Sequence, residues 1–483
     1  METTTKWQQL IAYSKAHGFL FNSSEIYGGL QAVYDYGPYG VLLKQKLKDF
    51  WWRSMTQLHH NIVGLDAAIL MAPAVWEASG HVAGFHDWKV DHRVSKKRYR
   101  VDVLIETHAA TLIEQGNAKA GEALLAEMHD LLNKADGSGL TKLLKKADIV
   151  CPIAKTSDWT ATKQFNLMLT TKLGAVEKET NQVYLRPETA QGIYVNFLNV
   201  QKSTRLPLPF GIAQIGKAFR NEIVARQFIF RMREFEQMEM QFFIPPGDDK
   251  QWFTHWTAKR QQWYKVLGIP DKDMAVHPHT QLAHYASEAV DLTYAFPFGS
   301  KEVEGIHARM DFDLKNHATL SKKKLTYFDP QRNQSYIPHV IETSVGCDRL
   351  VLLMLCHAFT QTAAEGINRT YLKFPPALAP ISAAILPLVK KPPLVQQAQA
   401  IFKALSPSFS LAYDEGGSIG KRYTRQDLIG TPYCITVDND TLADGQVTIR
   451  FRDTKAQERL PIADLPRYLQ QRCTLDNLLA QLA

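Results

Sequence analysis

Charged side chains that could bind a phosphate or an ammonium group are concentrated between residues 219 and 243. The stretch opens with Phe-Arg-Asn-Glu at 219–222 and continues after a short loop. Guanidinium groups donate paired hydrogen bonds to an anion and carboxylates accept from a cation, so one hairpin could bind both. A solvated hairpin with surface ion pairs is the alternative, which the flanking phenylalanines argue against. The charged residues are Arg220, Arg226, Arg231, Arg233, Glu222, Glu234, Glu236 and Glu239.

Two strands are expected to position these groups. Residues 210–217 are rich in β-formers, and residues 234–243 alternate between polar and apolar side chains. Alternation with a period of two assigns the apolar row to a core and the polar row to a wet binding surface. The polar face holds Phe235, Gln237, Glu239 and Gln241, and the apolar face holds Met238, Met240 and Phe242.

Two other stretches carry candidate site residues. Glu188 follows Pro187, which ends a strand and places Glu188 at a turn into a helix. Taken alone, Glu188 is better explained by the favourable field at a helix N-terminus. Further along, Glu342 and Ser344 share one strand face, and Arg349 lies in the first turn of an apolar, buried helix. An arginine there needs an anionic or aromatic partner, and a buried salt bridge is the plain alternative.

Composition bounds the class of protein. The chain has 483 residues, 45% hydrophobic and 22% charged, with a net charge of +8, which predicts more than one globular core and weakly favours a polyanionic partner. Five scattered cysteines predict neither a disulfide framework nor a zinc site. The N-terminus lacks a basic apolar leader and no apolar run approaches the ~18 residues of a membrane span. We therefore expect no membrane association and a cytoplasmic location.

The order of elements predicts two domains. Residues 41–58 form an amphipathic helix, 61–70 a strand and about 108–147 a helical insertion. After Pro375-Pro376 the pattern changes to alternating strands and helices, typical of an α/β unit. Residues 417–421 do not match a phosphate-binding loop, because its flanking positions hold the wrong residues. Three histidines have no spacing typical of a metal site and are assigned structural roles: His277, His279 and His284.

In this order, the elements resemble the three signature motifs of class II aminoacyl-tRNA synthetases, and in detail the homodimeric glycyl-tRNA synthetase type. Residues 41–73 resemble motif 1, residues 219–243 motif 2 and residues 342–355 motif 3. The most specific stretches are Trp-Glu-Ala-Ser-Gly-His at 76–81, Arg-Pro-Glu-Thr-Ala-Gln-Gly at 186–192 and Arg-Glu-Phe-Glu-Gln-Met-Glu at 233–239. One such stretch is weak evidence, whereas the ordered set covers nearly the whole chain.

The resemblance implies an α+β catalytic domain over residues 1–376, with an antiparallel class II synthetase sheet, flanking helices and a helical insertion at about 89–165. Residues 377–483 would form an α/β anticodon-binding domain. The implied enzyme is an ATP-dependent glycine-tRNA ligase that forms glycyl-adenylate and pyrophosphate and then transfers glycine to the 3′ end of tRNA(Gly). Glycine, ATP, Mg²⁺ and tRNA(Gly) are the implied ligands, and motif 1 implies a homodimer.

The same resemblance assigns roles to individual positions. Arg220 would hold the α-phosphate, Glu222 would bind the adenine amino group, and Phe235 and Arg349 would sandwich the adenine, with Arg220 and Arg349 as the catalytic pair. Ten positions would bind ATP: Arg220, Asn221, Glu222, Phe230, Arg231, Phe235, Glu302, Val303, Gly346 and Arg349. Glu302 would also lie near Mg²⁺. Five positions would bind glycine: Arg100, Glu188, Glu239, Glu342 and Ser344, the last by crowding the α-carbon.

One departure from the family pattern stands out. Many relatives carry a cysteine cluster just before Arg98, whereas residues 91–97 here contain no cysteine, so we expect no zinc there. Two other functions remain open on sequence. A synthetase-like protein could bind RNA without charging it, although no motif arginine or glutamate is missing. A class II enzyme for another small amino acid would need a side-chain pocket, which the three glutamates leave little room for.

Overall fold

The structure is a computed structural model that describes residues 2–174, 181–222, 227–279, 282, 286–364 and 367–483. Arg226 and His284 therefore lie outside the described residues. The chain divides into two compact units, which we describe separately. The larger unit comprises residues 1–69, 188–218 and 227–483, and the smaller unit comprises residues 70–187 and 219–226.

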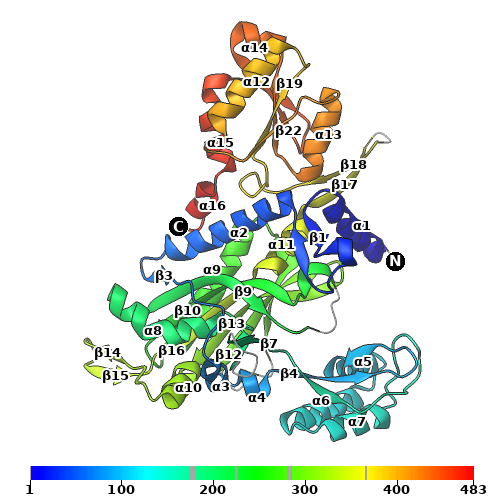
Figure 1. Ribbon diagram of the computed structural model, residues 1–483, viewed down its shortest axis with the longest axis vertical. Helices are drawn as coiled ribbons and strands as arrows, with labels where there is room; N and C mark the ends of the chain where they lie inside the picture. Colours follow the sequence, from blue (N-terminus) through cyan, green and yellow to red (C-terminus); the bar gives the residue numbers. More distant parts are fainter. Residues whose placement is uncertain (1, 175–180, 223–226, 280–281, 283–285, 365–366) are drawn as a thin grey trace. The chain divides into compact units, whose positions relative to one another are not determined.

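A seven-stranded sheet is the centre of the larger unit (Figure 1). Its strand order is β11-β12-β13-β16-β10-β9-β3. The neighbouring strands from β11 to β10 pair antiparallel, and β3 pairs parallel with β9. The strands are β3 (Ile62–Gly64), β9 (Phe210–Phe219), β10 (Glu234–Ile244), β11 (Met274–Pro278), β12 (Glu288–Phe296), β13 (Gly299–Met310) and β16 (His339–Gly346). This sheet confirms the predicted antiparallel core.

The alternation along β10 sorts its side chains as predicted. Met238, Met240 and Phe242 are buried in the main hydrophobic core. The polar row differs from the prediction in its exposure, because Gln237, Glu239 and Gln241 are only 7%, 3% and 0% exposed. Helix α8 (Ala190–Thr204) packs on β10 on this side and donates the Tyr194 hydroxyl to Gln241 Oε1 at 2.8 Å. The polar row is therefore covered by α8 and not open to water.

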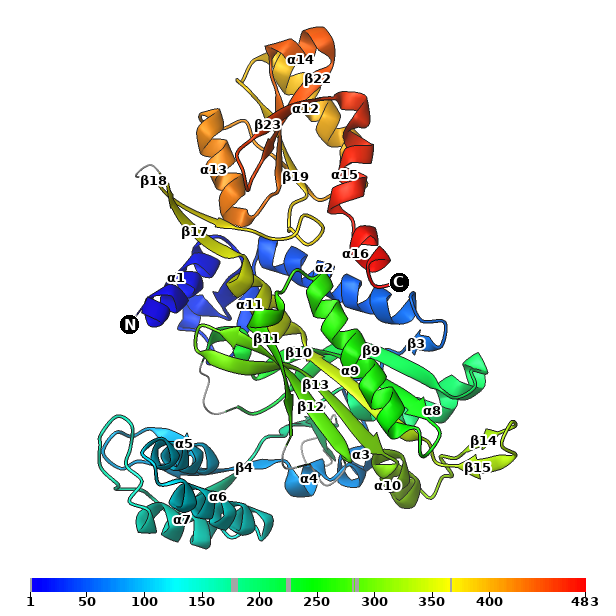
Figure 2. The same ribbon diagram turned by 180° about the vertical axis from the view of Figure 1, so that it is seen from behind.

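Helices cover the sheet on both sides. Helix α9 packs against β13 and β16 (Figure 2), and α2 packs against α11, which follows β16 directly. The helices of this part are α1 (Glu2–Ala16), α2 (Pro38–Thr56), α9 (Asp249–Val266), α10 (Phe312–Ser321) and α11 (Cys347–Ala358). Short elements complete it: β1 (Leu20–Asn22), β2 (Tyr34–Tyr36), β14 (Tyr327–Asp329), β15 (Gln334–Tyr336), β17 (Phe359–Ala364) and β18 (Ile367–Leu372).

The predicted helix over residues 41–58 is α2, which begins earlier. Pro38 occupies its first turn, where a missing N–H costs nothing. A Cβ on Gly40 would lie 1.9 Å from the Phe19 carbonyl oxygen, so only glycine allows this approach. The glycines at the start of α2 therefore serve packing.

The smaller unit contains the helical insertion. Helices α5, α6 and α7 enclose a core of their own, which includes Leu104, Met128 and Leu143, beside a three-stranded sheet of order β5-β4-β6. The helices are α3 (Pro73–Ala78), α4 (His81–Gly84), α5 (Val101–Glu114), α6 (Ala118–Asn133) and α7 (Gly137–Lys146). The strands are β4 (His86–Asp91), β5 (Arg98–Arg100), β6 (Lys163–Asn166), β7 (Leu169–Leu173) and β8 (Asn181–Leu185).

The C-terminal segment folds as the predicted alternation of strands and helices. Its five-stranded sheet has the order β20-β19-β21-β22-β23, with its own buried cluster. The elements are β19 (Ala383–Pro387), α12 (Pro392–Leu405), β20 (Leu411–Tyr413), α13 (Ile419–Ile429), β21 (Tyr433–Val437), α14 (Asn439–Asp444), β22 (Gln446–Phe451), β23 (Gln457–Pro461), α15 (Leu465–Cys473) and α16 (Asp476–Ala480). The domain boundary at 376/377 stays a prediction.

The last helix belongs to another core. Leu478 and Leu479 of α16 are buried in the main cluster together with residues of α2 and α11, and Arg53 of α2 pairs with Asp476 at 2.6 Å. The chain therefore leaves the central core after Ala379 and returns to it at its end.

Candidate active site

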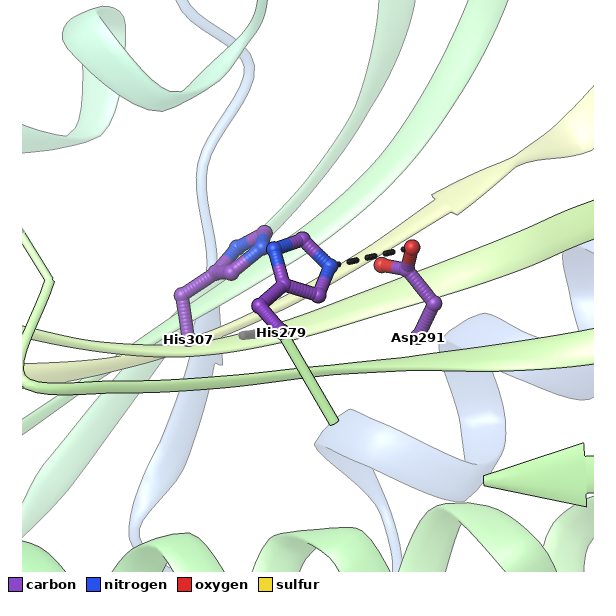
Figure 3. Close-up of side chains that lie close together, drawn as sticks. All are labelled: His279, Asp291 and His307. Carbon is purple, nitrogen blue, oxygen red and sulfur yellow. Dashed lines mark ion pairs between the residues drawn. The ribbon is translucent and has the colours of Figure 1, made fainter. Parts of the chain in front are cut away.

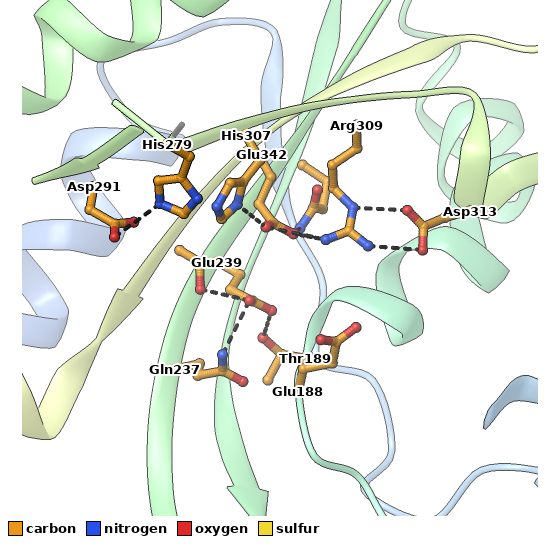
Figure 4. Close-up of polar contacts among 12 residues, drawn as sticks. Glu188, Thr189, Gln237, Glu239, His279, Asp291, His307, Arg309, Asp313 and Glu342 are labelled. Atoms are coloured by element: carbon orange, nitrogen blue, oxygen red, sulfur yellow. Dashed lines mark hydrogen bonds and ion pairs between the residues drawn. The ribbon is translucent and has the colours of Figure 1, made fainter. Parts of the chain in front are cut away.

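Three buried or half-buried glutamates meet where β10, β16 and the start of α8 come together (Figure 4). The β10/β16 register places Glu239 opposite Ser344 and Gln241 opposite Glu342. Glu239 and Glu342 are 3% and 4% exposed. The negative charges of Glu342 and Glu188 both raise the pKa of Glu239. The structure thus brings together the three glutamates predicted to bind glycine.

Glu342 is the compensated member of this trio. Its carboxylate lies 2.8 Å from His307 Nδ1 and 3.3 Å from an Arg309 nitrogen, and it accepts a hydrogen bond from Gln241 Nε2 at 2.7 Å. Burial alone would raise the pKa of Glu342, but the Arg309 charge and the His307 hydrogen bond outweigh it and lower that pKa. Glu342 is therefore a carboxylate anion with its charge already balanced.

Glu239 is held differently. It accepts hydrogen bonds from Thr189 Oγ1, from Ser344 Oγ at 2.7 Å and from Gln237 Nε2 at 3.3 Å, all neutral donors. Within the described ranges of the chain it forms no ion pair. Burial, followed by the charges of Glu342 and Glu188, raises the pKa of Glu239 to about 7. A cation bound beside Glu239 would relieve this repulsion.

Gln237 supplies a further sign of a binding site. Its Oε1 is buried and has no hydrogen-bond partner among the described residues. Burying an amide oxygen without a donor costs roughly 1–3 kcal/mol, so such atoms are rare unless a ligand or water satisfies them. The orphaned acceptor is in the side chain that also donates to Glu239.

A layer of polar side chains behind the glutamates was not predicted. Arg309 binds Asp313 through two hydrogen bonds of 2.8 and 3.1 Å, and Gln191 donates to both Glu188 and Asp313, at 2.9 and 3.0 Å. Arg309 lies near the end of β13 and Asp313 in the first turn of α10, so no helical spacing in the sequence indicated this pair or the contact of Arg309 with Glu342. The layer fixes the glutamates in place.

Arg349 lies at the start of α11 as predicted. Its guanidinium lies 4.5 Å from the Phe230 ring centroid and 3.0 Å from Glu302 Oε2, and its Nε donates to the Phe230 carbonyl at 3.3 Å. A Cβ on Gly346 would lie 3.3 Å from Arg349 Cδ, so the glycine leaves room for the arginine side chain. The structure therefore groups four predicted ATP ligands: Phe230, Glu302, Gly346 and Arg349.

The other ATP candidates of the larger unit lie on neighbouring elements. Val303 is buried in β13, while Phe235, at the start of β10, and Arg231, after the short helix Phe228–Phe230, are half-buried. Arg349 stacks on Phe230 in this structure. The predicted adenine sandwich between Phe235 and Arg349 stays a prediction.

The four remaining candidates belong to the smaller unit. Arg220 donates its Nε to the Pro187 carbonyl at 3.0 Å and lies over the Phe85 ring at 5.4 Å. The Asn221 N–H donates to Leu167 O at 2.8 Å, and the charge of Glu222 acts on Arg100. Arg100 is bound to Asp102 at 2.5 Å and lies 3.5 Å from Asp87. The predicted roles of Arg100, Arg220, Asn221 and Glu222 stay predictions.

The fold and this site define the class of protein. A class II synthetase core is expected to have an antiparallel sheet with buried carboxylates. It is also expected to have an arginine at the start of the helix that follows the motif 3 strand, as Arg349 does here. The family described as "tRNA synthetase class II core domain (G, H, P, S and T)" matches residues 173–358. "Anticodon binding domain" matches residues 382–472, and "Glycyl-tRNA synthetase insertion domain 1" matches residues 113–167.

Similar proteins narrow the class to one family. The glycine–tRNA ligase of Chlorobaculum tepidum is 49% identical over 463 residues, which cover 95% of this chain and 98% of the relative. Those of Staphylococcus epidermidis and Staphylococcus aureus are 48% identical over 471 residues, which cover 96% of this chain and 98% of each relative. The chain belongs to the glycine–tRNA ligase family.

Membrane insertion finds no support in the helices. Among the described residues, no helix combines the length and the apolar character that crossing a bilayer requires.

Proposed function

We propose that this protein is a glycine–tRNA ligase, which activates glycine with ATP and transfers it to the 3′ end of tRNA(Gly). A carboxylate oxygen of glycine attacks the α-phosphorus of ATP, and the bond to the bridging oxygen breaks so that pyrophosphate leaves. A hydroxyl of the terminal tRNA adenosine then attacks the glycyl carbonyl, and AMP leaves. Neither step needs an enzyme nucleophile, so positioning and charge neutralisation supply the catalysis.

The observation that carries the substrate assignment is the charge imbalance around Glu239. Glu342 is balanced by Arg309 and His307, whereas Glu239 is buried among neutral donors with its pKa raised. The ammonium group of glycine supplies the missing positive charge and up to three hydrogen-bond donors. Glu188, Glu239 and Glu342 are its proposed ligands, and Arg100 and Arg220 bind the glycine carboxylate.

Rejection of alanine depends on a wall near the α-carbon. Ser344 is the proposed wall, and its hydroxyl is fixed because it donates to Glu239 Oε1 at 2.7 Å. One methyl group changes binding by only ~1–3 kcal/mol in a loosely fitting pocket, so a wall that cannot move is needed. The hydrogen bond to a residue that itself binds substrate supports this rigidity.

In this proposal, ATP binds beside the residues grouped around Arg349. The guanidinium of Arg349 stacks on one face of the adenine and Phe235 on the other, as suits a planar cation and a π-face. Arg231 and Arg220 bind the phosphates, and Asn221 and Glu222 complete the adenine side. The half-exposed Glu302 carboxylate is a hard oxygen ligand that fits Mg²⁺, which when bound neutralises phosphate charge.

Exposed apolar side chains near the N-terminus support a homodimer. Ile26 and Tyr27 are 89% and 87% exposed, and Leu30 and Val41 are half exposed. Exposed apolar side chains of this kind occur at interaction surfaces. Val41 lies on α2, the motif 1 helix, and the other three precede that helix in the sequence. The five cysteines are free thiols, in keeping with the cytoplasmic location that forms part of the proposal.

Exchange of label between pyrophosphate and ATP tests the proposal. We expect exchange that depends on glycine, with alanine and serine at least 100-fold less effective as judged by kcat/KM. Charging assays with tRNA(Gly) should then show transfer. Robust exchange with alanine or serine and none with glycine would overturn the assignment.

A further inference from the structure

A second cluster of side chains that can bind a metal lies beside Glu342, at the β11 edge of the sheet. His279 directly follows β11, Asp291 is on β12 and His307 is on β13 (Figure 3). One potential ligand atom from each residue lies within 4.8 Å of the others. None of the three is a proposed ligand of glycine, ATP or Mg²⁺, although His307 contacts Glu342.

The local geometry gathers these groups closely. His279 Nε2 lies 3.0 Å from Asp291 Oδ2, and the two imidazole centroids are 5.9 Å apart. All three side chains are only partly exposed, at 31%, 22% and 18% for His279, Asp291 and His307. The β12/β13 register places Gly305 opposite Asp291, and a Cβ on Gly305 would lie 2.8 Å from His307 Cε1. The glycine thus makes room for the imidazole of His307.

His307 has the support expected of a metal-binding histidine. Its Nδ1 lies 2.8 Å from Glu342 Oε1, which leaves Nε2 available toward the cluster. A carboxylate that receives the far N–H of an imidazole fixes the ring and its tautomer, the arrangement found behind many metal-ligating histidines. Glu342 is in turn held by Arg309 and Gln241. Figure 4 shows these contacts running from His307 of the cluster to Glu342 and on to Arg309.

We propose that His279, Asp291 and His307 form a binding site for a divalent transition metal such as Zn²⁺. Two imidazole nitrogens and one carboxylate oxygen are a donor set that suits Zn²⁺, Co²⁺ or Ni²⁺, whereas Mg²⁺ and Ca²⁺ prefer oxygen ligands alone. Three protein ligands leave a fourth tetrahedral position for water. The site shares no ligand with the Glu302 carboxylate proposed for Mg²⁺. It does not depend on the proposed function, because its readout is metal binding.

Chemistry predicts how the cluster changes on binding. In a tetrahedral site with metal–ligand distances of about 2.0–2.1 Å, ligand atoms lie about 3.3 Å apart. The direct contact between His279 and Asp291 therefore opens slightly while His307 moves inward. The metal replaces the proton on His279 Nε2, and His307 keeps its Nδ1–H for Glu342.

Titration of the chelator-treated full chain with Co²⁺ tests the proposal, because a four-coordinate Co²⁺ complex has intense visible absorption. We expect one equivalent to bind with this spectrum and Zn²⁺ to displace it. His279→Ala and His307→Ala should each weaken Co²⁺ affinity at least tenfold, and Asp291→Asn should also weaken it while preserving side-chain shape. The control His60→Ala, at an exposed histidine outside the cluster, should bind as the wild type does.

Thermal unfolding of each variant separates loss of the site from loss of the fold. If His279→Ala fails to fold, Asp291→Asn carries the test. Absence of a four-coordinate Co²⁺ spectrum in the wild type would overturn the proposal. So would binding that Asp291→Asn and His279→Ala leave unchanged, because the metal would then occupy another part of the chain.

Discussion

Buried charge is arranged in opposite ways in the catalytic sheet and in the C-terminal segment. Glu239 is buried beside two other carboxylates, and among the described residues its hydrogen-bond donors are all neutral. In the C-terminal segment, Arg450 forms a two-pronged pair with Asp427 at 2.9 and 3.0 Å, and Arg369 binds the same carboxylate at 2.9 Å. The first region leaves a negative charge for a ligand to balance. In the second, the buried carboxylate is already paired with arginines of the protein, Arg450 and, from β18, Arg369.

The difference separates functional charge from structural charge. Arg422 is 1% exposed and donates to the carbonyls of Pro387, Leu388 and Asp414. Together with Arg450, it could have been an RNA ligand on sequence alone. Both side chains are committed to backbone or carboxylate acceptors inside their own segment, so they serve the fold. Contacts of this segment with tRNA must therefore use other, more exposed side chains.

Replacing Arg349 should give the largest effect on activity. Arg349→Ala removes the guanidinium proposed to stack on adenine, and we expect glycine-dependent exchange to fall about 10²–10³-fold, the usual loss for one preorganised charged group. The fold should survive, because its ion pair with the half-exposed Glu302 contributes little to stability.

Arg53→Ala is the matched control for Arg349→Ala. Arg53 also forms an ion pair, with Asp476, but it lies on α2 away from the proposed ligands. We expect its exchange rate to stay within twofold of the wild type. Unchanged exchange in Arg349→Ala would contradict the adenine role.

Replacing Arg450 should show the reverse pattern. Arg450→Ala leaves the buried Asp427 with one fewer cation, and breaking such a pair costs about 3 kcal/mol. Denaturant unfolding should register this loss, while glycine-dependent exchange should persist under native conditions. Arg425→Ala, which breaks a half-exposed pair with Asp414, should cost less than about 1 kcal/mol. Loss of exchange in a folded Arg450→Ala protein would contradict the claim that Arg450 serves the fold and not the reaction.

Replacing Glu239 tests the uncompensated charge directly. Glu239→Gln keeps the shape but removes the negative charge, and hydrogen bonds to charged groups contribute about 1.5–3 kcal/mol. We therefore expect the KM for glycine to rise about 10- to 100-fold. Glu234→Gln is the control on the same strand, since Glu234 pairs with the half-exposed Lys217. A glycine KM that Glu239→Gln leaves unchanged would exclude Glu239 as an ammonium ligand.

The pH dependence of stability gives a smaller and independent effect. The pKa of Glu239 is about 7 in the folded chain against 4.5 as an ordinary glutamate, so the folded state prefers the protonated form. Stability that this group contributes below pH 4.5 is therefore lost as pH rises to about 7. Glu239→Gln should be more stable than the wild type by about 1–3 kcal/mol at pH 8 and similar to it at pH 4.5. Urea unfolding at both pH values measures the difference, and a variant less stable at pH 8 would contradict the account.

Much of this arrangement follows from the sequence. Period-two alternation assigned Met238 and Glu239 to opposite faces of β10, and the apolar run after Gly346 identified α11 and the place of Arg349. Local patterns can do this because each depends on neighbours within a few residues. The helix predicted over residues 41–58 was likewise confirmed, apart from its start.

The parts that the sequence missed depend on distant contacts. His307 and Arg309 approach Glu342 only because β13 and β16 pair, and no local pattern contains that register. The cluster of His279, Asp291 and His307 also depends on the alignment of β11, β12 and β13, which the spacing of the histidines in the sequence does not show. Removal of the predicted domain over residues 377–483 would also take Leu478 and Leu479 out of the central core.

The most direct test of the central claim is a crystal structure of the protein soaked with glycine and ATP. We predict density for glycyl-adenylate with its ammonium nitrogen about 3 Å from Glu239, a normal charge-assisted hydrogen-bond distance, and with Glu188 and Glu342 as its other ligands. An adenylate whose ammonium group lies away from Glu239, with the carboxylate instead bound by a cation of the protein, would contradict the account.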